Sequence, residues 1–196
     1  MRIIGGTFRS RLISMPKGVD IRPTQDKVRE AIFNVLGDIA GKHVLELFAG
    51  SGAFGIEAIS RGARHVTFVD NNPRCIETIK MNLKSLEASG DLYDVIKADA
   101  LKVFPGFAAS GNKYDIVFID PPYYRELAKK CLINADAYDI LSRIGLVIVE
   151  HFKKDILETD LRTLAFNQDR RYGDTVITIF KRAYEKSKDS GLSGNI

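Results

Sequence analysis

Residues 43–70, HVLELFAGSGAFGIEAISRGARHVTFVD, contain two apolar segments separated by a glycine-rich turn and a short helical segment. The apolar segments 43–48 and 65–70 have the length and near-continuous hydrophobicity of strands that are buried on both faces. Residues 53–61 between them are typical of a helix, and Gly62 follows as a helix end. A strand, a helix and a strand in this order predict a parallel pair joined by a helical crossover.

The alternation of strands and helices continues on both sides of this stretch and predicts an α/β fold, a mostly parallel sheet with helices on both faces. The segment 170–180, with Gly173 at its turn, predicts an antiparallel hairpin at one edge of the sheet. Residues 1–15 predict a short hairpin in which Ile3-Ile4 and Leu12-Ile13 pair across Gly5-Gly6. Further strands are expected at 93–97, 114–120 and 146–150, and helices at 24–36, 73–88, 101–109, after Tyr124 and at 137–143.

The charge of the chain is concentrated in its first residues. The 196 residues hold 29 Lys and Arg against 25 Asp and Glu, a net charge of +4. This whole surplus lies in residues 1–22, where the basic side chains Arg2, Arg9, Arg11, Lys17 and Arg22 stand against Asp20 alone. The organisation expected is a basic N-terminal hairpin or arm at 1–22, an α/β domain at 23–183 and a flexible tail at 184–196.

Several protein classes are excluded by composition. Cys75 and Cys131 form neither a disulfide framework nor a metal motif, and the three histidines lack metal-ligand spacing, so no metal is predicted. The apolar runs are far too short for a membrane span, and the first residues lack a signal peptide. A cytoplasmic, monomeric protein with reduced cysteines is expected.

The glycine-rich turn after the first strand reads Gly50-Ser-Gly-Ala-Phe-Gly55, and Asp70 ends the next strand. Glycines let the backbone approach a ligand closely, and a carboxylate after the second strand can accept hydrogen bonds from ribose hydroxyls. This pattern favours an adenosine-type ligand, while a tight turn without a ligand is the alternative.

Two adenosine ligands compete, a dinucleotide and S-adenosylmethionine. The carboxylate of Glu46, just before the glycines, would repel a diphosphate and would suit the ammonium group of a methionine moiety. Asp99 follows the third strand and can accept a hydrogen bond from an adenine amino group, with Ala98 or Ala100 leaving room for the ring. Asp99 is also a candidate helix cap.

The fourth strand ends in Asp120-Pro121-Pro122-Tyr123. Two prolines stiffen the backbone and remove two N–H donors, so this loop presents acceptors and an aromatic ring. That set suits a planar base with an exocyclic amine, and a proline-stiffened strand exit with a surface tyrosine is the alternative.

These motifs resemble those of class I methyltransferases that act on exocyclic amines of nucleobases. Residues 2–12 and the segment 22–36, RPTQDKVREAIFNVL, narrow the resemblance to the bacterial RsmD family, over about residues 1–182. The resemblance implies a Rossmann-like class I methyltransferase fold with a seven-stranded sheet, and methylation of the 2-amino group of one guanine in small-subunit (16S) ribosomal RNA. The implied cofactor is S-adenosylmethionine, and the implied partner is ribosomal RNA, within an assembling ribosomal subunit or free.

The predicted site residues follow from the motifs and the resemblance together. Asp120, Pro121, Pro122 and Tyr123 are expected to hold the base, and the arm is expected to contact RNA phosphates through Arg2, Arg9, Arg11, Lys17 and Arg22. The arm's basic residues can alternatively keep an edge hairpin soluble. The predicted cofactor-binding residues are Glu46, Phe48, Ala49, Gly50, Gly52, Asp70, Asn71, Asp99 and Ala100.

Three other functions stay open at this point. An adenine amino-methyltransferase acting on DNA or RNA is the nearest, because the Asp-Pro-Pro-Tyr tetrapeptide does not distinguish the purines. A nicotinamide-dependent oxidoreductase is disfavoured by Glu46 and by the same tetrapeptide. An RNA-binding module that has lost catalysis is disfavoured by the intact run from Asp120 to Tyr123.

Overall fold

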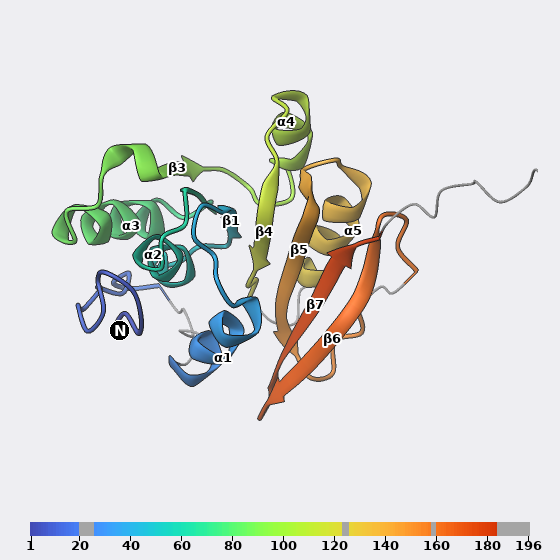
Figure 1. The fold of residues 1–196 in the computed structure, drawn as a ribbon, viewed down its shortest axis with the longest axis horizontal. Coiled ribbons are helices and arrows are strands. Elements are labelled where there is room, and N and C mark those ends of the chain that lie inside the picture. The colour runs from blue at the N-terminus through green and yellow to red at the C-terminus, as the bar shows by residue number, and fades with distance from the viewer. Residues whose placement is uncertain (20–25, 123–125, 158–159, 184–196) are drawn as a thin grey trace, which may run out of the picture.

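The computed structural model describes residues 1–19, 26–122, 126–157 and 160–183, which are built around a seven-stranded sheet (Figure 1). The strands lie in the order β3-β2-β1-β4-β5-β7-β6. A single-turn 3-10 helix spans Gly90–Leu92. The strands are β1 (His43–Leu47), β2 (His65–Asp70), β3 (Tyr93–Lys97), β4 (Tyr114–Ile119), β5 (Leu141–Phe152), β6 (Leu164–Tyr172) and β7 (Thr175–Arg182), and the α-helices are α1 (Asp26–Leu36), α2 (Ala53–Ser60), α3 (Pro73–Ser85), α4 (Phe104–Ala109) and α5 (Leu127–Ala137).

The sheet is mixed in the way that the sequence predicts. Strands β3, β2, β1, β4 and β5 pair in parallel, whereas β7 pairs antiparallel with both β5 and β6. The chain order reverses between β1 and β4, because β2 and β3 extend to one side of β1 while β4 and β5 lie on the other. In open α/β sheets such a reversal marks the place where ligands bind, at the carboxyl ends of the strands.

Alternating strand residues divide the core into two layers. On one face Val44, Phe68 and Ile148 belong to a cluster that includes residues of α1, α2 and α3. On the other face Leu45, Val69 and Val149 pack with residues of α4 and α5. Helices therefore cover both faces, as the near-continuous apolar strands indicate.

One expected helix is absent, and several boundaries differ. The helix expected at 137–143 is wrong, because α5 ends at Ala137 and residues 141–143 begin β5. Leu141 pairs with Tyr114 of β4, and the Tyr114 N–H donates to the carbonyl of Ile140 at 2.8 Å. Pairing with a neighbouring strand thus outweighs the local preference of these residues. The third helix ends at residue 85 instead of 88, and the fourth begins at 104 instead of 101.

The N-terminal segment, residues 1–19, is joined to the domain instead of standing apart as an arm. The expected hairpin is present in short form, as an antiparallel bridge between Arg2 and Leu12 with backbone hydrogen bonds from Ile3 to Arg11 and from Ile13 to Met1, both at 2.9 Å. The residues between these paired stretches form turns against α2. Ile3 and Ile13 are buried in the same cluster as α1, α2 and α3. At Gly6, whose φ is 73°, a Cβ atom would overlap the carbonyl group of Ser60. A side chain would therefore prevent this close approach to α2.

A buried carboxylate on α2 holds the start of this segment. The side chain of Glu57 is fully buried and accepts hydrogen bonds from the N–H groups of Ile4 at 2.8 Å and Gly5 at 2.7 Å. Its charge is balanced by Arg61 at 2.8 Å and by the buried Arg29 at 3.7 Å. The guanidinium of Arg29 also donates to the carbonyl of Arg2. The first residues are therefore tied to both α1 and α2.

Replacing Ile13 by Ala tests whether the N-terminal segment belongs to the core. Ile13 is 4% exposed, and truncation of such a buried residue costs about 2–5 kcal/mol. We expect a loss in this range in the free energy of unfolding by urea. Leu12→Ala is the control, since Leu12 is 74% exposed and should change this free energy by less than about 0.5 kcal/mol. Equal, small effects at both positions would show that the segment is not part of the cooperative fold.

Candidate active site

Backbone hydrogen bonds align four loops along the carboxyl edge of the sheet. The N–H of Ala49 donates to the backbone carbonyl of Val69 at 3.1 Å, and the N–H of Ala98 donates to the backbone carbonyl of Asp70 at 3.1 Å. The N–H of Asp120 donates to the backbone carbonyl of Leu47 at 3.5 Å. The loops after β1, β2, β3 and β4 therefore lie side by side. The glycine motif, Asp70, Asp99 and Asp120 are brought to the same edge of the sheet.

The loop after β1 has an uncommon backbone. Phe48, Gly50 and Gly52 have φ values of 59°, 57° and 76°, all in the left-handed region. Glycine adopts this region freely, but an aromatic residue such as Phe48 rarely does, and such positions gather at ligand sites. The loop is closed by a 2.7 Å hydrogen bond from Gly52 N–H to the carbonyl of Ala49.

Glu46 holds the start of α2. Its carboxylate accepts hydrogen bonds from the N–H of Phe54 at 3.3 Å and from that of Gly55 at 2.9 Å. A Cβ atom on Gly55 would lie 2.7 Å from Oε2 of Glu46 and would also overlap Phe68. Only glycine therefore lets strand and helix approach this closely, as the third glycine of the motif predicts.

Burial has a large electrostatic effect on Glu46. Removal from water raises the pKa of this carboxyl from its ordinary 4.5 to about 8, despite the opposing effect of the two backbone hydrogen bonds. The nearby charge of Asp70 raises the pKa further, and that of Arg29 lowers it. The group is thus poised to change charge near neutral pH.

Asp70 links the loops that follow β1 and β2. One carboxylate oxygen accepts from Gly50 N–H at 2.9 Å, and the other accepts from Asn72 N–H at 2.8 Å. Asp99 accepts from Leu101 N–H at 2.9 Å within the turn after β3, but it caps no helix, because α4 begins only at Phe104 and has Val103 as its N-cap residue. Each oxygen keeps capacity for a further hydrogen bond, because a carboxylate has about four lone-pair sites. Asn71 is exposed and Ala100 is buried beside these two carboxylates.

The loops 48–52, 70–72 and 98–100 contain two carboxylates and no Lys or Arg. A diphosphate needs basic groups or the N–H groups of a helix N-terminus. Here the carboxylate of Glu46 occupies two of those N–H groups, on Phe54 and Gly55. The edge therefore suits a cationic ligand better than a dinucleotide.

Asp120 and Pro121 follow directly on β4, beside the loop that follows β1. Pro121 is buried, Pro122 is exposed, and Tyr123 lies outside the described residues. The rings of Phe33, Phe54 and Phe118 stack in series, with centroid distances of 4.9 and 4.0 Å. This stack connects α1 and α2 to the carboxyl end of β4, where Phe118 lies. In Figure 1, α1 lies beside that end of the strand.

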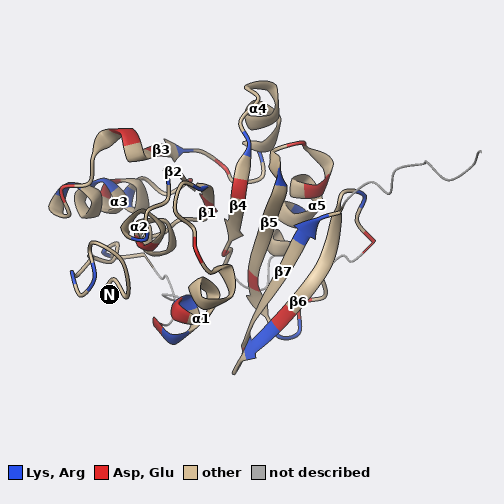
Figure 2. Ribbon diagram, in the orientation of Figure 1, with Lys and Arg blue, Asp and Glu red and all other residues tan. Residues whose placement is uncertain are grey.

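The predicted RNA-contacting residues lie on the N-terminal segment, whose path over α2 and α3 is visible in Figure 2. Arg2, Arg9, Arg11 and Lys17 are exposed, and Arg22 lies outside the described residues. Arg11 also donates to the carbonyl of Ser85 at the end of α3. The segment therefore presents its basic side chains to solvent while its backbone is docked.

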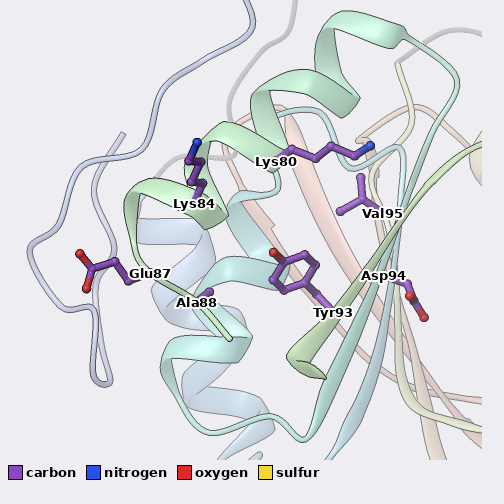
Figure 3. Close-up of a pocket in the computed structure, with 7 residues that line it drawn as sticks. All are labelled: Lys80, Lys84, Glu87, Ala88, Tyr93, Asp94 and Val95. Atoms are coloured by element: carbon purple, nitrogen blue, oxygen red, sulfur yellow. The ribbon is translucent and has the colours of Figure 1, made fainter. Parts of the chain in front are cut away.

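A groove of about 600 Å³ lies between α3 and the edge strand β3 (Figure 3). Lys80 and Lys84 of α3 and Tyr93 of β3 line it, together with the acidic Glu87 and Asp94. Tyr93 is the first residue of β3, so the groove opens toward the amino ends of the strands. It therefore does not coincide with the edge that carries the motifs.

Sequence reasoning missed one polar residue that touches the glycine loop, Asn82 of α3. Its side-chain amide is buried and donates to the carbonyl of Ser51 at 3.0 Å. The sequence does contain a signal for Asn82, which is a polar residue on the apolar stripe of α3 next to Ile79 and Leu83. A polar side chain buried at such a position needs hydrogen-bond partners.

Neither a metal centre nor a membrane span is found in the described part of the chain. No three His, Cys, Asp or Glu side chains gather there in a way that could hold a metal ion. Among the described helices, none has both the length and the hydropathy of a membrane-crossing segment.

Glu46→Gln tests the raised pKa of Glu46 through the pH dependence of stability. Between about pH 4.5 and pH 8 the folded protein keeps a proton on Glu46 that the unfolded chain releases. The stabilising contribution of this proton is complete below pH 4.5 and is lost as the pH rises through about 8. The free energy of unfolding of wild type minus that of the variant should fall over this range. A constant difference, from urea unfolding at several pH values, contradicts the assignment.

Comparison with known proteins gives similarity over nearly the whole chain. It is 37% identical over 183 residues to YlbH of Bacillus subtilis (strain 168), named as a candidate rRNA methyltransferase, covering 93% of this chain and 99% of YlbH. It is 30% identical over 191 residues to ribosomal RNA small subunit methyltransferase D of Escherichia coli (strain K12), covering 97% and 94% of the two chains.

Solved structures show the same fold. The Escherichia coli protein yhhF, described as a candidate methyltransferase, matches with a TM-score of 0.79 and 30% identity over 94% of this chain and 99% of its own. The magnesium protoporphyrin IX methyltransferase ChlM of Synechocystis PCC 6803, solved with bound S-adenosylmethionine, matches with a TM-score of 0.61 and 19% identity over 81% and 77% of the two chains, a likeness of fold alone. The family described as Conserved hypothetical protein 95 matches residues 1–181. The chain thus has the fold of S-adenosylmethionine-dependent methyltransferases and belongs to this family, that of RsmD and YlbH.

Proposed function

We propose that this protein transfers a methyl group from S-adenosylmethionine to the exocyclic 2-amino group of a guanine in small-subunit (16S) ribosomal RNA. The observation that carries the proposal is the placement of Asp120-Pro121-Pro122 at the end of β4. There it lies beside the glycine loop of β1, where the strand order reverses. A base held at the loop after β4 would therefore be the neighbour of a cofactor held at the glycine loop after β1.

The residues of the edge fit the proposed cofactor. Asp70 and Asp99 have acceptor capacity for ribose hydroxyls and an adenine amine, and the uncommon backbone at Phe48, Gly50 and Gly52 leaves main-chain atoms close to a ligand. Glu46 adds negative charge beneath the loop when ionised. Bound S-adenosylmethionine supplies a methyl group on a sulfonium, which is a strong electrophile.

The base is held by Asp120 and its proline loop. The carboxylate of Asp120 and the carbonyl of Pro121 accept the two hydrogens of the guanine amine, which directs the nitrogen lone pair away from them. That lone pair is delocalised into the ring, so alignment is the main task of the site, and good alignment lowers a barrier by roughly 7–11 kcal/mol. We assign to Tyr123 the role of stacking on the base, which leaves its own stack in the RNA to reach this site.

Methylation leaves the nitrogen with one proton too many. Asp120 or a water molecule takes up this proton, which restores the neutral amine. Asp120 thus first orients the nucleophile, and the charge is removed after the transfer.

The RNA substrate is supported by two independent features. The N-terminal segment presents Arg2, Arg9, Arg11 and Lys17 to solvent, as contacts to phosphates require. Two relatives similar over almost the full chain carry names that refer to rRNA methylation. We propose with it that the protein acts in the cytoplasm, in ribosome assembly, as a monomer.

Methylation of adenine is the main alternative function, because the Asp-Pro-Pro-Tyr sequence does not distinguish the exocyclic amines of the two purines. Incubation with labelled S-adenosylmethionine and ribosomal RNA, followed by digestion and mass spectrometry of the nucleosides, separates the two. N2-methylguanosine supports the proposal, and N6-methyladenosine replaces it with the alternative.

Asp120→Asn tests the role of the carboxylate. The amide keeps the shape but cannot accept the proton, so we expect kcat at saturating cofactor to fall by about 100-fold or more. The dissociation constant of S-adenosylhomocysteine should stay within about twofold, since the cofactor is assigned to other loops.

Asp139→Asn is the control, because Asp139 is exposed and pairs with Lys113 and Arg182 away from the candidate site. It should retain wild-type transfer. Undiminished transfer by Asp120→Asn would remove Asp120 from the mechanism.

Joint substitution of Arg9 and Lys17 by Ala tests the RNA-binding segment. Removal of residues 1–16 is unsuitable, since it would delete the buried Ile3 and Ile13. The double variant should bind ribosomal RNA more weakly, and the slope of log affinity against log salt should decrease by up to about 2. Lys130→Ala, on the exposed side of α5, is the matched control. An unchanged affinity and salt slope would exclude these residues from the interface.

A further inference from the structure

The side chain of Asn82 joins the N-terminal segment to the glycine loop. Its amide nitrogen Nδ2 donates to the carbonyl of Ser14 and to that of Ser51, both at 3.0 Å. Its oxygen Oδ1 accepts from the N–H of Ser14 at 2.8 Å. One buried amide therefore holds two segments that are 37 residues apart in the chain.

The contact with Ser51 reaches the middle of the candidate cofactor loop. Ser51 is buried between Gly50 and Gly52, which both have positive φ values. Gly50 N–H is held by Asp70, and Gly52 N–H is held by Ala49. The carbonyl of Ser51 is held from α3, by Asn82. The loop conformation thus depends on contacts from β2, from the loop itself and from α3.

The contacts with Ser14 make Asn82 depend on the docked N-terminal segment. Two of the three hydrogen bonds of its amide go to the backbone of Ser14. If the segment leaves α3, the buried amide loses these partners and is no longer fixed in the orientation that reaches Ser51. An unsatisfied buried amide is costly, so the loop contact and the segment contact stabilise each other.

We infer that Asn82 is a positioning residue for cofactor binding, and that it makes the affinity for the cofactor depend on the docked N-terminal segment. The segment that carries the proposed RNA contacts is then also a support of the cofactor site. Because coupling between two sites is reciprocal, bound cofactor must in turn stabilise the docked segment. The inference rests on the proposed function for the identity of the cofactor.

Binding of S-adenosylhomocysteine, measured by calorimetry, tests the inference. Asn82→Leu has a similar volume and removes all three hydrogen bonds, so we expect the dissociation constant to rise by about tenfold. The KM for S-adenosylmethionine should rise by a similar factor while kcat at saturation stays within about twofold, because Asn82 does not touch the base loop. General damage to the fold would lower kcat as well.

Thr78→Val is the matched control. The hydroxyl of Thr78 donates to the carbonyl of Arg74 at 2.8 Å, one turn before Asn82, so its hydrogen bond stays within α3. Its loss should lower the melting temperature without changing the affinity for S-adenosylhomocysteine. An equal loss of affinity in both variants would reduce Asn82 to a stabiliser of α3 and overturn the inference.

Ser14→Pro tests the N-terminal side without altering α3 and serves even if Asn82→Leu does not fold. Ser14 is exposed, and proline removes the N–H that Asn82 binds. The affinity for S-adenosylhomocysteine should fall in Ser14→Pro too. In the double variant with Asn82→Leu, the loss of affinity should be smaller than the sum of the two separate losses in binding free energy. An unchanged affinity in Ser14→Pro would uncouple the segment from the cofactor.

Amide hydrogen exchange supplies the reciprocal measurement. In the wild type, S-adenosylhomocysteine should slow exchange at Ser14, and in Asn82→Leu it should not. The same exchange rate with and without ligand in the wild type would overturn the coupling. Failure of the wild type to bind S-adenosylhomocysteine would instead overturn the proposed function, so the two failures are distinguishable.

Discussion

The hydrogen bonds that Glu46 accepts from Phe54 and Gly55 determine how β1 turns into α2, and the rest of the site depends on that turn. They place a buried carboxyl at the helix N-terminus, where an external anion would otherwise bind. They also require a glycine at position 55, since a side chain there would overlap Glu46 and Phe68. With the helix end closed in this way, the backbone of the loop and the neighbouring carboxylates are the groups of this edge proposed to contact a ligand.

The other carboxyl groups of this edge also hold the backbone. Asp70 and Asp99 accept backbone N–H groups, so each helps to shape the edge as well as to charge it, whereas Glu46, whose pKa burial raises to about 8, mainly shapes it. The carboxylates proposed to bind a ligand are therefore the same side chains that hold the loops in place.

The N-terminal segment has a larger role than its charge suggests. Its basic side chains face solvent, but Ile3 and Ile13 are core residues, and Glu57 and Asn82 bind its backbone. A separation into an RNA-binding arm and a cofactor-binding sheet is therefore too simple. The segment is joined to the glycine loop through the buried amide of Asn82, so the elements proposed to bind RNA and cofactor share one structural support.

The sequence by itself determined the order of the elements, the parallel sheet with its antiparallel edge and the motifs at the strand ends. These features are encoded locally, in apolar periodicity, in glycines and in residues that follow each strand. Only the tertiary structure decided that residues 141–143 join a strand, that Glu46 closes α2, and that Asn82 links Ser14 to Ser51. Each of these depends on pairing or burial between segments far apart in the chain, where the partner's position sets the energy and no local pattern records it.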